Sequence, residues 1–185
     1  MRSVAAEKIG QDWDSTTRFH CSDSQLQTFW KAAERTAETC TIDIFMDNAS
    51  REARQYTGDI SFMVPAIAAL HGSAPIIRNY LNTLTISQLS NGLFLDCCPG
   101  KGASSSGPYE ACFSHVDAIW RNYVWFGDRE ILKKHWKAIQ RHLGLWMSLI
   151  NDRGMLDVER ARNGIMLETF RFFPYFDWAY MDRQG

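Results

Sequence analysis

The sequence predicts an all-α fold in one domain, and three observations support this prediction. Apolar residues recur at helical spacing in several long segments, whereas no segment alternates apolar and polar residues for the length of a strand. Short links join the helical segments, which favours successive helical hairpins. At 185 residues, the chain is also long enough to bury one substantial hydrophobic core.

The first helix is expected at residues 23–40, after an extended lead-in at residues 1–21. Ser22 and Gln25 have the spacing of a capping box, in which two side chains bond the free backbone N–H groups at a helix start. An apolar stripe follows at helical spacing, and we expect it to face the core. It consists of Leu26, Phe29, Trp30, Ala33 and Ala37.

Further helices are expected at residues 58–71, 74–88, 112–126 and 128–151. Ser73 is expected to cap the third helix, Gly72 to end the second and Pro65 to kink it. The stripes expected to face the core in the last three helices are Ile76, Ile77, Tyr80, Leu81 and Leu84; Phe113, Val116, Trp120 and Tyr123; and Ile131, Leu132, His135, Trp136, Ile139, Leu143, Trp146 and Leu149.

Residues 90–108 interrupt the helical pattern and are rich in Gly, Pro and Ser, which is typical of a loop. A loop of this length in a compact domain is more often a lid or a binding loop than a linker. Its Gly-Lys-Gly-Ala-Ser-Ser run lacks the spacing of a phosphate-binding loop, so nucleotide binding is not expected.

The composition is that of a globular protein and argues against several classes of function. Hydrophobic residues make up 45% of the chain, charged residues make up 22%, and the formal net charge is −1. We therefore expect no nucleic-acid partner, and no apolar stretch reaches the roughly 20 residues of a membrane span. The N-terminal segment lacks the apolar region of a secretory signal, so no export signal is expected and the compartment stays open.

The cysteines and histidines predict neither a metal site nor a cofactor. The cysteines are odd in number and have no CxxC spacing, which favours reduced thiols that pack as small apolar groups. His135 and His142 have no acidic partner at ligand spacing and are expected in the core or on the surface. The cysteines are Cys21, Cys40, Cys97, Cys98 and Cys112.

The densest group of charges lies in the stretch DNASREARQYTGD, from Asp47 to Asp59. Charges this dense do not form a core, so the stretch is either a solvated loop or a polar site at the start of a helix. Asp59 precedes the apolar pattern of the second helix, where the helix dipole favours a carboxylate. The carboxylates and arginines of this stretch have opposite effects on the protonation of Glu52.

The spacing of Asp47, Glu52 and Asp59, with Arg51 directly before the glutamate and Tyr-Thr-Gly before the last aspartate, resembles the acidic signature of bacterial α-L-rhamnosidases. The segments FHCSDSQLQTFWKAAERTAETCTIDIFMD, VDAIWRNYVWFGDREILKK and FDWAYMDRQG are similar to other parts of that family. The resemblance spans residues 19–185. Many members carry Cys-Pro after the first aspartate and Trp before the last Thr-Gly-Asp, where this chain has Asn-Ala and Tyr56.

The resemblance implies an inverting glycoside hydrolase with an (α/α)6 toroid, of which residues 22–185 would form about half. It assigns the general acid to Glu52. The family's general base comes from the second half of the toroid and has no counterpart here, so we expect the chain alone to be inactive. The side chains that the resemblance places around a terminal α-L-rhamnose are Asp47, Arg51, Tyr56, Asp59, Asp177 and Trp178.

Other interpretations stay open at this point. The toroid could process a different sugar, because Tyr56 replaces the Trp of many members, or the segment could be a carbohydrate-binding scaffold without catalysis. No physical reason favours Glu110, Asp157 or Glu168 as a general base within the chain. Half a toroid would also expose apolar helix faces, so we expect self-association.

Overall fold

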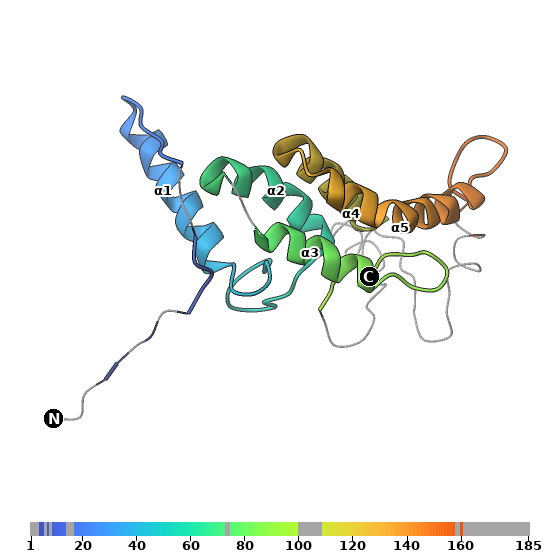
Figure 1. Cartoon of the computed structure of the whole chain (residues 1–185), viewed down its shortest axis with the longest axis horizontal. Coiled ribbons are helices and arrows are strands. Elements are labelled where there is room, and N and C mark those ends of the chain that lie inside the picture. Colours follow the sequence, from blue (N-terminus) through green and yellow to red (C-terminus); the bar gives the residue numbers. More distant parts are fainter. Residues whose placement is uncertain are drawn as a thin grey trace, which may run out of the picture.

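The computed structural model describes residues 4, 5, 7, 9–13, 17–72, 75–99, 109–157 and 160, without the side chains of residues 109–112. Within these residues it contains five helices and no strand, so the predicted all-α fold is confirmed (Figure 1). The helices are α1 (Ser24–Thr39), α2 (Thr57–His71), α3 (Pro75–Ile86), α4 (Tyr109–Phe126) and α5 (Arg129–Ser148).

Helix α4 is the centre of the packing, because α2, α3 and α5 all contact it. Helix α1 lies at one end of the molecule, and residues 40–56 connect it to α2 (Figure 1). The core joins residues of α2 to α5 with Ala37 of α1 and Phe45 of the connection. The expected stripe of α3 is confirmed, since Ile76, Ile77, Tyr80, Leu81 and Leu84 are all buried.

The helix ends follow local capping chemistry. Asp23 caps α1 by accepting hydrogen bonds from the backbone N–H groups of Gln25 at 2.8 Å and Leu26 at 3.4 Å, so the expected cap at Ser22 is wrong by one residue. Gly72 ends α2 in the left-handed conformation, as predicted. Helix α2 continues through Pro65 as one element. Residues 73 and 74, including the expected cap at Ser73, lie outside the described part of the chain.

The stripe expected to bury α1 is largely exposed. Leu26 and Phe29 are 50% and 67% exposed, whereas Ala37 near the helix end is buried. The reason is the position of α1 at the end of the molecule, where only part of the helix meets a neighbour. Trp30 is partly buried against the core and also stacks on Phe19 of the lead-in, with ring centroids 4.8 Å apart.

The stripe expected for α4 is shifted by one residue around the helix. Trp120 is exposed, whereas His115 and Asn122 are buried. Because neighbouring helices cover this face, the two polar side chains find partners inside the protein. His115 lies 2.9 Å from the Thr85 hydroxyl, and the Asn122 amide donates to Asp128 at 3.3 Å.

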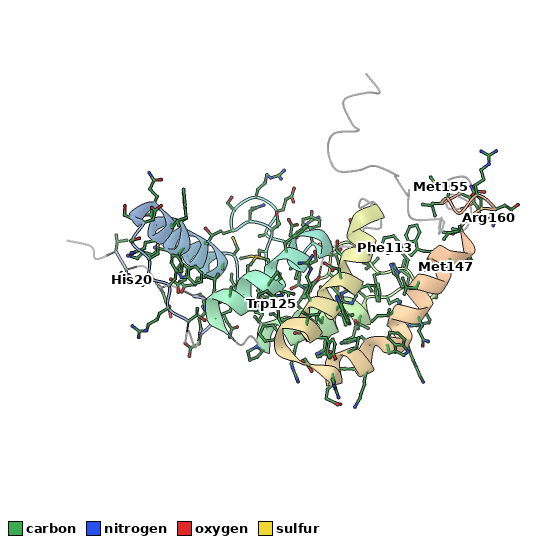
Figure 2. The ribbon with its side chains drawn as sticks, turned by 90° about the horizontal axis from the view of Figure 1, so that it is seen from above. His20, Phe113, Trp125, Met147, Met155 and Arg160 are labelled. Atoms are coloured by element: carbon green, nitrogen blue, oxygen red, sulfur yellow. The ribbon has the colours of Figure 1, made fainter. Side chains whose placement is uncertain are left out.

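Large apolar side chains remain exposed on α1, α2, α4 and α5, and Figure 2 labels Phe113, Trp125 and Met147 among them. Self-association through such surfaces stays a prediction. Among the described residues, no helix has the length and apolar character that a membrane crossing requires. The side chains on these four helices that are at least 40% exposed are Leu26, Phe29, Phe62, Phe113, Trp120, Val124, Trp125, Trp136, Leu143 and Met147.

The first part of the predicted loop 90–108 is a buried segment and not a lid. Residues 92–97 are all buried between helices. Gly92 has φ +97°, and a Cβ at this position would lie 2.8 Å from the backbone oxygen of Arg141 on α5. This close approach requires glycine and sets the path of residues 93–98, which we call the buried segment.

Gln55 joins the connection after α1 to this buried segment. Its side-chain oxygen accepts from the Phe45 N–H at 3.2 Å, and its amide donates to the Cys98 carbonyl at 2.6 Å. Its backbone oxygen accepts from the Cys98 N–H at 3.2 Å. Gln55 is fully buried, so no water replaces these partners when the side chain is removed.

Gln55→Ala is expected to lower the free energy of unfolding by about 2–3 kcal/mol, because it leaves a buried N–H and a buried carbonyl without partners. Urea unfolding followed by circular dichroism measures this loss. Gln140→Ala removes an exposed glutamine of α5 and is the control. Equal stability of the two variants would contradict the role given to Gln55.

Three histidines lie inside the packing of α4 and α5. His115, His135 and His142 are each no more than 2% exposed. Burial, with a smaller contribution from neighbouring positive charge, lowers the pKa of His115 to about 3 and that of His135 to about 4. Neither ring nitrogen of His135 has a hydrogen-bond partner among the described residues. Of the alternatives left open for His135 and His142, the core position is confirmed.

These depressed pKa values predict loss of stability in acid. Below the usual histidine pKa of about 6.5, the unfolded chain takes up protons that the folded chain does not bind. Each such histidine then lowers the free energy of unfolding by up to about 1.4 kcal/mol per pH unit. For His135 this loss occurs as the pH falls from about 6.5 to about 4.

His135→Leu is therefore expected to reduce the slope of the free energy of unfolding against pH by up to about 1.4 kcal/mol per pH unit, since leucine takes up no proton. Urea unfolding at several pH values between about 7.5 and 5 measures the slope across this window. His20→Gln replaces an exposed histidine and should leave it unchanged. A slope in His135→Leu equal to that of the wild type would rule out this explanation.

Candidate active site

The predicted site residues lie mainly on the connection between α1 and α2. We call residues 47–56 the acidic loop. Two hydrogen bonds between Asp47 and Arg54 close this loop. The Asp47 N–H donates to the Arg54 carbonyl, and the Arg54 N–H donates to Asp47 Oδ1, both at 2.9 Å. Ala53 closes the turn with φ +49°, in the left-handed region.

Asn48 stabilises the tip of the acidic loop. Its side-chain oxygen accepts from the N–H groups of Ser50 at 3.1 Å and Arg51 at 2.7 Å, and its amide donates to Asp47 Oδ2. Asparagine is well suited to such local turns, because its side chain imitates a backbone group. The loop is thus ordered by bonds within itself, although the sequence departs from Cys-Pro at this point.

Glu52 lies on this loop with its side chain partly exposed. Arg51 forms an ion pair with it, with Nη2 and Oε1 2.8 Å apart; the side chains of Arg51 and Glu52 are 74% and 26% exposed. An ion pair this exposed contributes little to stability, so a ligand can displace Arg51 at small cost.

Tyr56 lies at the base of the loop, beside the same groups. Partial burial raises the pKa of its phenol above the usual value, and the Glu52 carboxylate raises it further. A hydrogen bond from the Arg54 side chain acts in the opposite direction. Glu52 and Arg54 therefore act in opposite directions on the pKa of the Tyr56 phenol.

The base of the acidic loop is held against the buried segment. Tyr56 pairs with Cys97 in an isolated antiparallel bridge, and the next residue, Thr57, donates both its N–H and its hydroxyl to the Asp96 carbonyl, each at 2.8 Å. Because Thr57 is also the first residue of α2, these bonds fix where the helix begins relative to the loop.

Asp59 is placed by α2 and not by the acidic loop. It lies in the first turn of the helix, where the helix dipole favours its negative charge. Its charge also raises the pKa of the buried Tyr80 on α3, although burial of the phenol is the larger cause. The described contacts thus gather Asp47, Arg51, Glu52 and Tyr56 in one loop, while the charge of Asp59, in the first turn of α2, acts on Tyr80. Asp177 and Trp178, the other residues predicted to bind sugar, lie outside the described part of the chain.

Sequence reasoning missed Asp96, which lies on the buried segment next to this loop. It is 5% exposed, and burial raises its pKa to about 6. Hydrogen bonds from the backbone N–H groups of Asp96 and Cys97 oppose this shift, and the Arg54 charge opposes it to a smaller extent. Its Oδ1 has no hydrogen-bond partner among the described residues. The signal in the sequence is a single charged residue after Leu-Phe-Leu, in an otherwise apolar run.

Arg54 was also missed as a site residue, although the stretch that contains it was recognised. Its charge lowers the pKa of Asp96, Tyr56 and Cys97 alike, so its guanidinium lies within electrostatic reach of all three. Asp47 of the acidic loop also acts on Cys97, so charges of the acidic loop reach the buried segment.

The cysteines near the site are not reactive thiolates. Burial and the Asp96 charge raise the pKa of Cys97 to about 11. The described cysteines, Cys21, Cys40, Cys97 and Cys98, are all free thiols, as expected from the sequence, and Cys112 has no described side chain. In the described ranges, no group of three or more potential ligands could hold a metal ion.

A cavity of about 370 Å³ lies elsewhere, between the lead-in and α1. It is open to solvent and is lined by the stacked pair Phe19 and Trp30 together with polar side chains. Figure 2 labels His20 in this region. The cavity does not include the acidic loop, so it is separate from the candidate site.

Comparison with known proteins identifies the family. The bacterial alpha-L-rhamnosidase 6 hairpin glycosidase domain matches residues 14–183. No curated protein matches the chain in sequence.

Solved structures of rhamnosidases share the fold. A rhamnosidase of Bacillus sp. GL1 has a TM-score of 0.76 at 23% identity over 92% of this chain, which spans 16% of that protein. The Streptomyces avermitilis α-L-rhamnosidase complexed with L-rhamnose has a TM-score of 0.66 at 22% identity, with coverage of 72% and 13%. A Klebsiella oxytoca rhamnosidase with rhamnose bound has a TM-score of 0.66 at 18% identity, with coverage of 80% and 28%.

The chain therefore spans less than a third of each of these structures. Sequence identities this low support a shared fold alone. The family, in contrast, matches most of the chain in sequence, over residues 14–183. The all-helical hairpin architecture and the match over residues 14–183 lead to one conclusion: this chain belongs to the bacterial α-L-rhamnosidase six-hairpin glycosidase domain family.

Proposed function

We propose that this chain supplies the general-acid side of an active site that cleaves terminal α-L-rhamnose with inversion. Glu52 is the proposed acid. The observation that carries the proposal is that Glu52 is partly exposed on an ordered loop, pairs with the largely exposed Arg51 and lies close to the Tyr56 phenol. A carboxyl in this position is reachable by a glycosidic oxygen.

The neighbouring groups have chemically suitable roles in sugar binding. Carboxylates such as Asp47 accept hydrogen bonds from sugar hydroxyl pairs, while guanidinium groups such as Arg51 donate to hydroxyl oxygens. An aromatic ring such as Tyr56 packs on the apolar face of a sugar. Asp59, Asp177 and Trp178 complete the proposed set. The rhamnose-bound Streptomyces and Klebsiella structures support rhamnose as the sugar.

A general acid must hold a proton when the substrate is bound. In this proposal Arg51 leaves Glu52 to bind a sugar hydroxyl, and Glu52 donates its proton to the leaving oxygen as the glycosidic bond breaks.

Inversion needs a second carboxylate, roughly 6.5–9.5 Å from the acid, to activate water on the opposite face of the sugar. We place this general base in the part of the toroid that this chain does not span. Among the candidates within the chain, Asp157 accepts from the Arg160 N–H at 2.9 Å beyond the end of α5. This local contact gives it no link to the acidic loop.

The 185-residue chain is accordingly expected to bind L-rhamnose weakly and to hydrolyse aryl α-L-rhamnosides very slowly or not at all. Saturation-transfer NMR with L-rhamnose, with D-glucose as the control sugar, tests binding, and release of para-nitrophenol tests turnover. Rapid turnover by the isolated chain would contradict this expectation and show that the chain contains its own general base.

In a rhamnosidase that joins this segment to the rest of the toroid, Glu52→Gln is expected to lower kcat roughly 10²- to 10⁴-fold on alkyl rhamnosides, whose leaving oxygen needs a proton. The loss should be much smaller with para-nitrophenyl rhamnoside, since nitrophenolate leaves without protonation.

Glu130→Gln is the matched control for this substitution, because Glu130 is an exposed glutamate that pairs with Lys133 at 3.0 Å on α5. It should leave both rates unchanged. Equal losses on the two leaving groups in Glu52→Gln would exclude the general-acid role of Glu52.

A further inference from the structure

The cavity between the lead-in and α1 is built by two short stretches of the chain. Four side chains of α1 form one wall, because they are spaced by three or four residues and so lie on one face of the helix. They are Gln27, Trp30, Lys31 and Glu34, and residues 17–20 form the other wall. The volume of about 370 Å³ lies within the range of small-molecule sites, roughly 300–1,000 Å³.

Hydrogen bonds hold the lead-in against this face of α1. The side-chain amide of Gln27 donates to the Cys21 carbonyl at 2.5 Å and lies 3.3 Å from Nδ1 of His20. Because an amide nitrogen only donates, Nδ1 accepts this bond and the proton of the neutral ring lies on Nε2. His20, which is exposed and labelled in Figure 2, therefore has an N–H group free to donate to a ligand.

Two aromatic rings give the cavity an apolar surface. Phe19 and Trp30 stack with centroids 4.8 Å apart and an angle of 17° between the rings. Trp30 also packs against the core, which fixes its position, while Phe19 is 39% exposed. Rings held in this way offer a rigid surface to the C–H groups of a ligand.

The charges of the cavity are unbalanced in favour of cations. Arg18 and Lys31 are exposed, and within the described part of the chain neither of them forms an ion pair. Glu34 is the one carboxylate among the described residues that line the cavity. Guanidinium and ammonium groups without a partner are well suited to bind a carboxylate.

We propose that this cavity is a second sugar site, which binds a uronate, a sugar that carries a carboxylate group. The sugar ring packs on the stacked pair, its carboxylate pairs with Arg18 and Lys31, and its hydroxyl groups bond the neutral polar side chains. A simple anion would leave the aromatic rings unused, and a neutral sugar would leave both cations unpaired. The cavity shares no lining residue with the acidic loop, so this proposal does not depend on the role proposed for Glu52.

The experiment titrates the whole 185-residue chain with D-glucuronate at neutral pH, with D-glucose as the neutral sugar of the same ring configuration. NMR of the backbone and indole N–H groups follows binding. D-Glucuronate is expected to shift the signals of residues 17–20 and the indole signal of Trp30, and to bind more tightly than D-glucose. Each exposed ion pair contributes a factor of up to about five to the affinity.

Arg18→Gln and Lys31→Gln are each expected to weaken D-glucuronate binding by up to about fivefold, and the double variant should bind D-glucuronate no better than D-glucose. Glu34→Gln should strengthen binding by a similar factor, because it removes a carboxylate that repels the ligand. Arg35→Gln is the matched control, since Arg35 is an exposed arginine of α1 outside the cavity, and it should leave the affinity unchanged. A merely structural role of these side chains would not make the effects of Glu34→Gln and Lys31→Gln opposite in sign.

Three results would overturn the proposal. Equal affinity for D-glucuronate in the wild type and in the double variant would show that the two cations do not bind it. Acetate that binds as tightly as D-glucuronate would show an anion site that does not use the aromatic rings. Signals of residues 17–20 that stay unchanged, or D-glucuronate that L-rhamnose displaces, would show that the cavity is not a separate uronate site.

Discussion

The structure around the candidate site depends on one short pairing, in which Gln55, Tyr56 and Thr57 bind residues 96–98. Backbone bonds link Gln55 to Cys98 and Thr57 to Asp96, and the Gln55 side chain adds further bonds to Phe45 and Cys98. The residues joined are about forty positions apart in the chain. Since several of these groups are buried, breaking one bond leaves a polar group without water, which is more unfavourable than the net gain of an average hydrogen bond.

This pairing gives the two arginines of the loop different environments. Arg51 extends into solvent and pairs with Glu52 through an exposed contact that a ligand can replace. The charge of Arg54 instead lowers the pKa of Tyr56 and Asp96 at the base of the loop. The ion pair of Arg51 is thus exposed to a ligand, whereas the charge of Arg54 acts on groups at the base of the loop, although the two arginines look alike in the sequence.

The packing of α4 shows how much polarity this core contains. His115 and Asn122 lie inside it, with Thr85 and Asp128 as their partners. At the same time, aromatic side chains such as Trp120 and Trp125 remain exposed on the same helix. The chain spans between 13% and 28% of the rhamnosidase structures compared above, and surfaces of this kind are typical of places where further protein packs.

The sequence by itself determined the all-α class, the five helices to within about three residues at most ends, and the loop that carries Asp47, Glu52 and Arg51. Helical spacing, capping residues and charge density are local properties, so a single chain displays them directly. Even the resemblance to α-L-rhamnosidases rests on short-range spacing, and the match over residues 14–183 confirms the family.

Only the tertiary structure decided which faces are buried and which distant residues join the site. Periodicity measures the apolar side of one helix and contains no information about its neighbours, which is why the stripe of α1 is exposed and that of α4 is rotated. Asp96 and Gln55 were likewise hidden, because their roles arise from contacts between segments far apart in sequence. Burial and the charge of a residue from another segment set the protonation of such groups, and both exist only after the chain has folded.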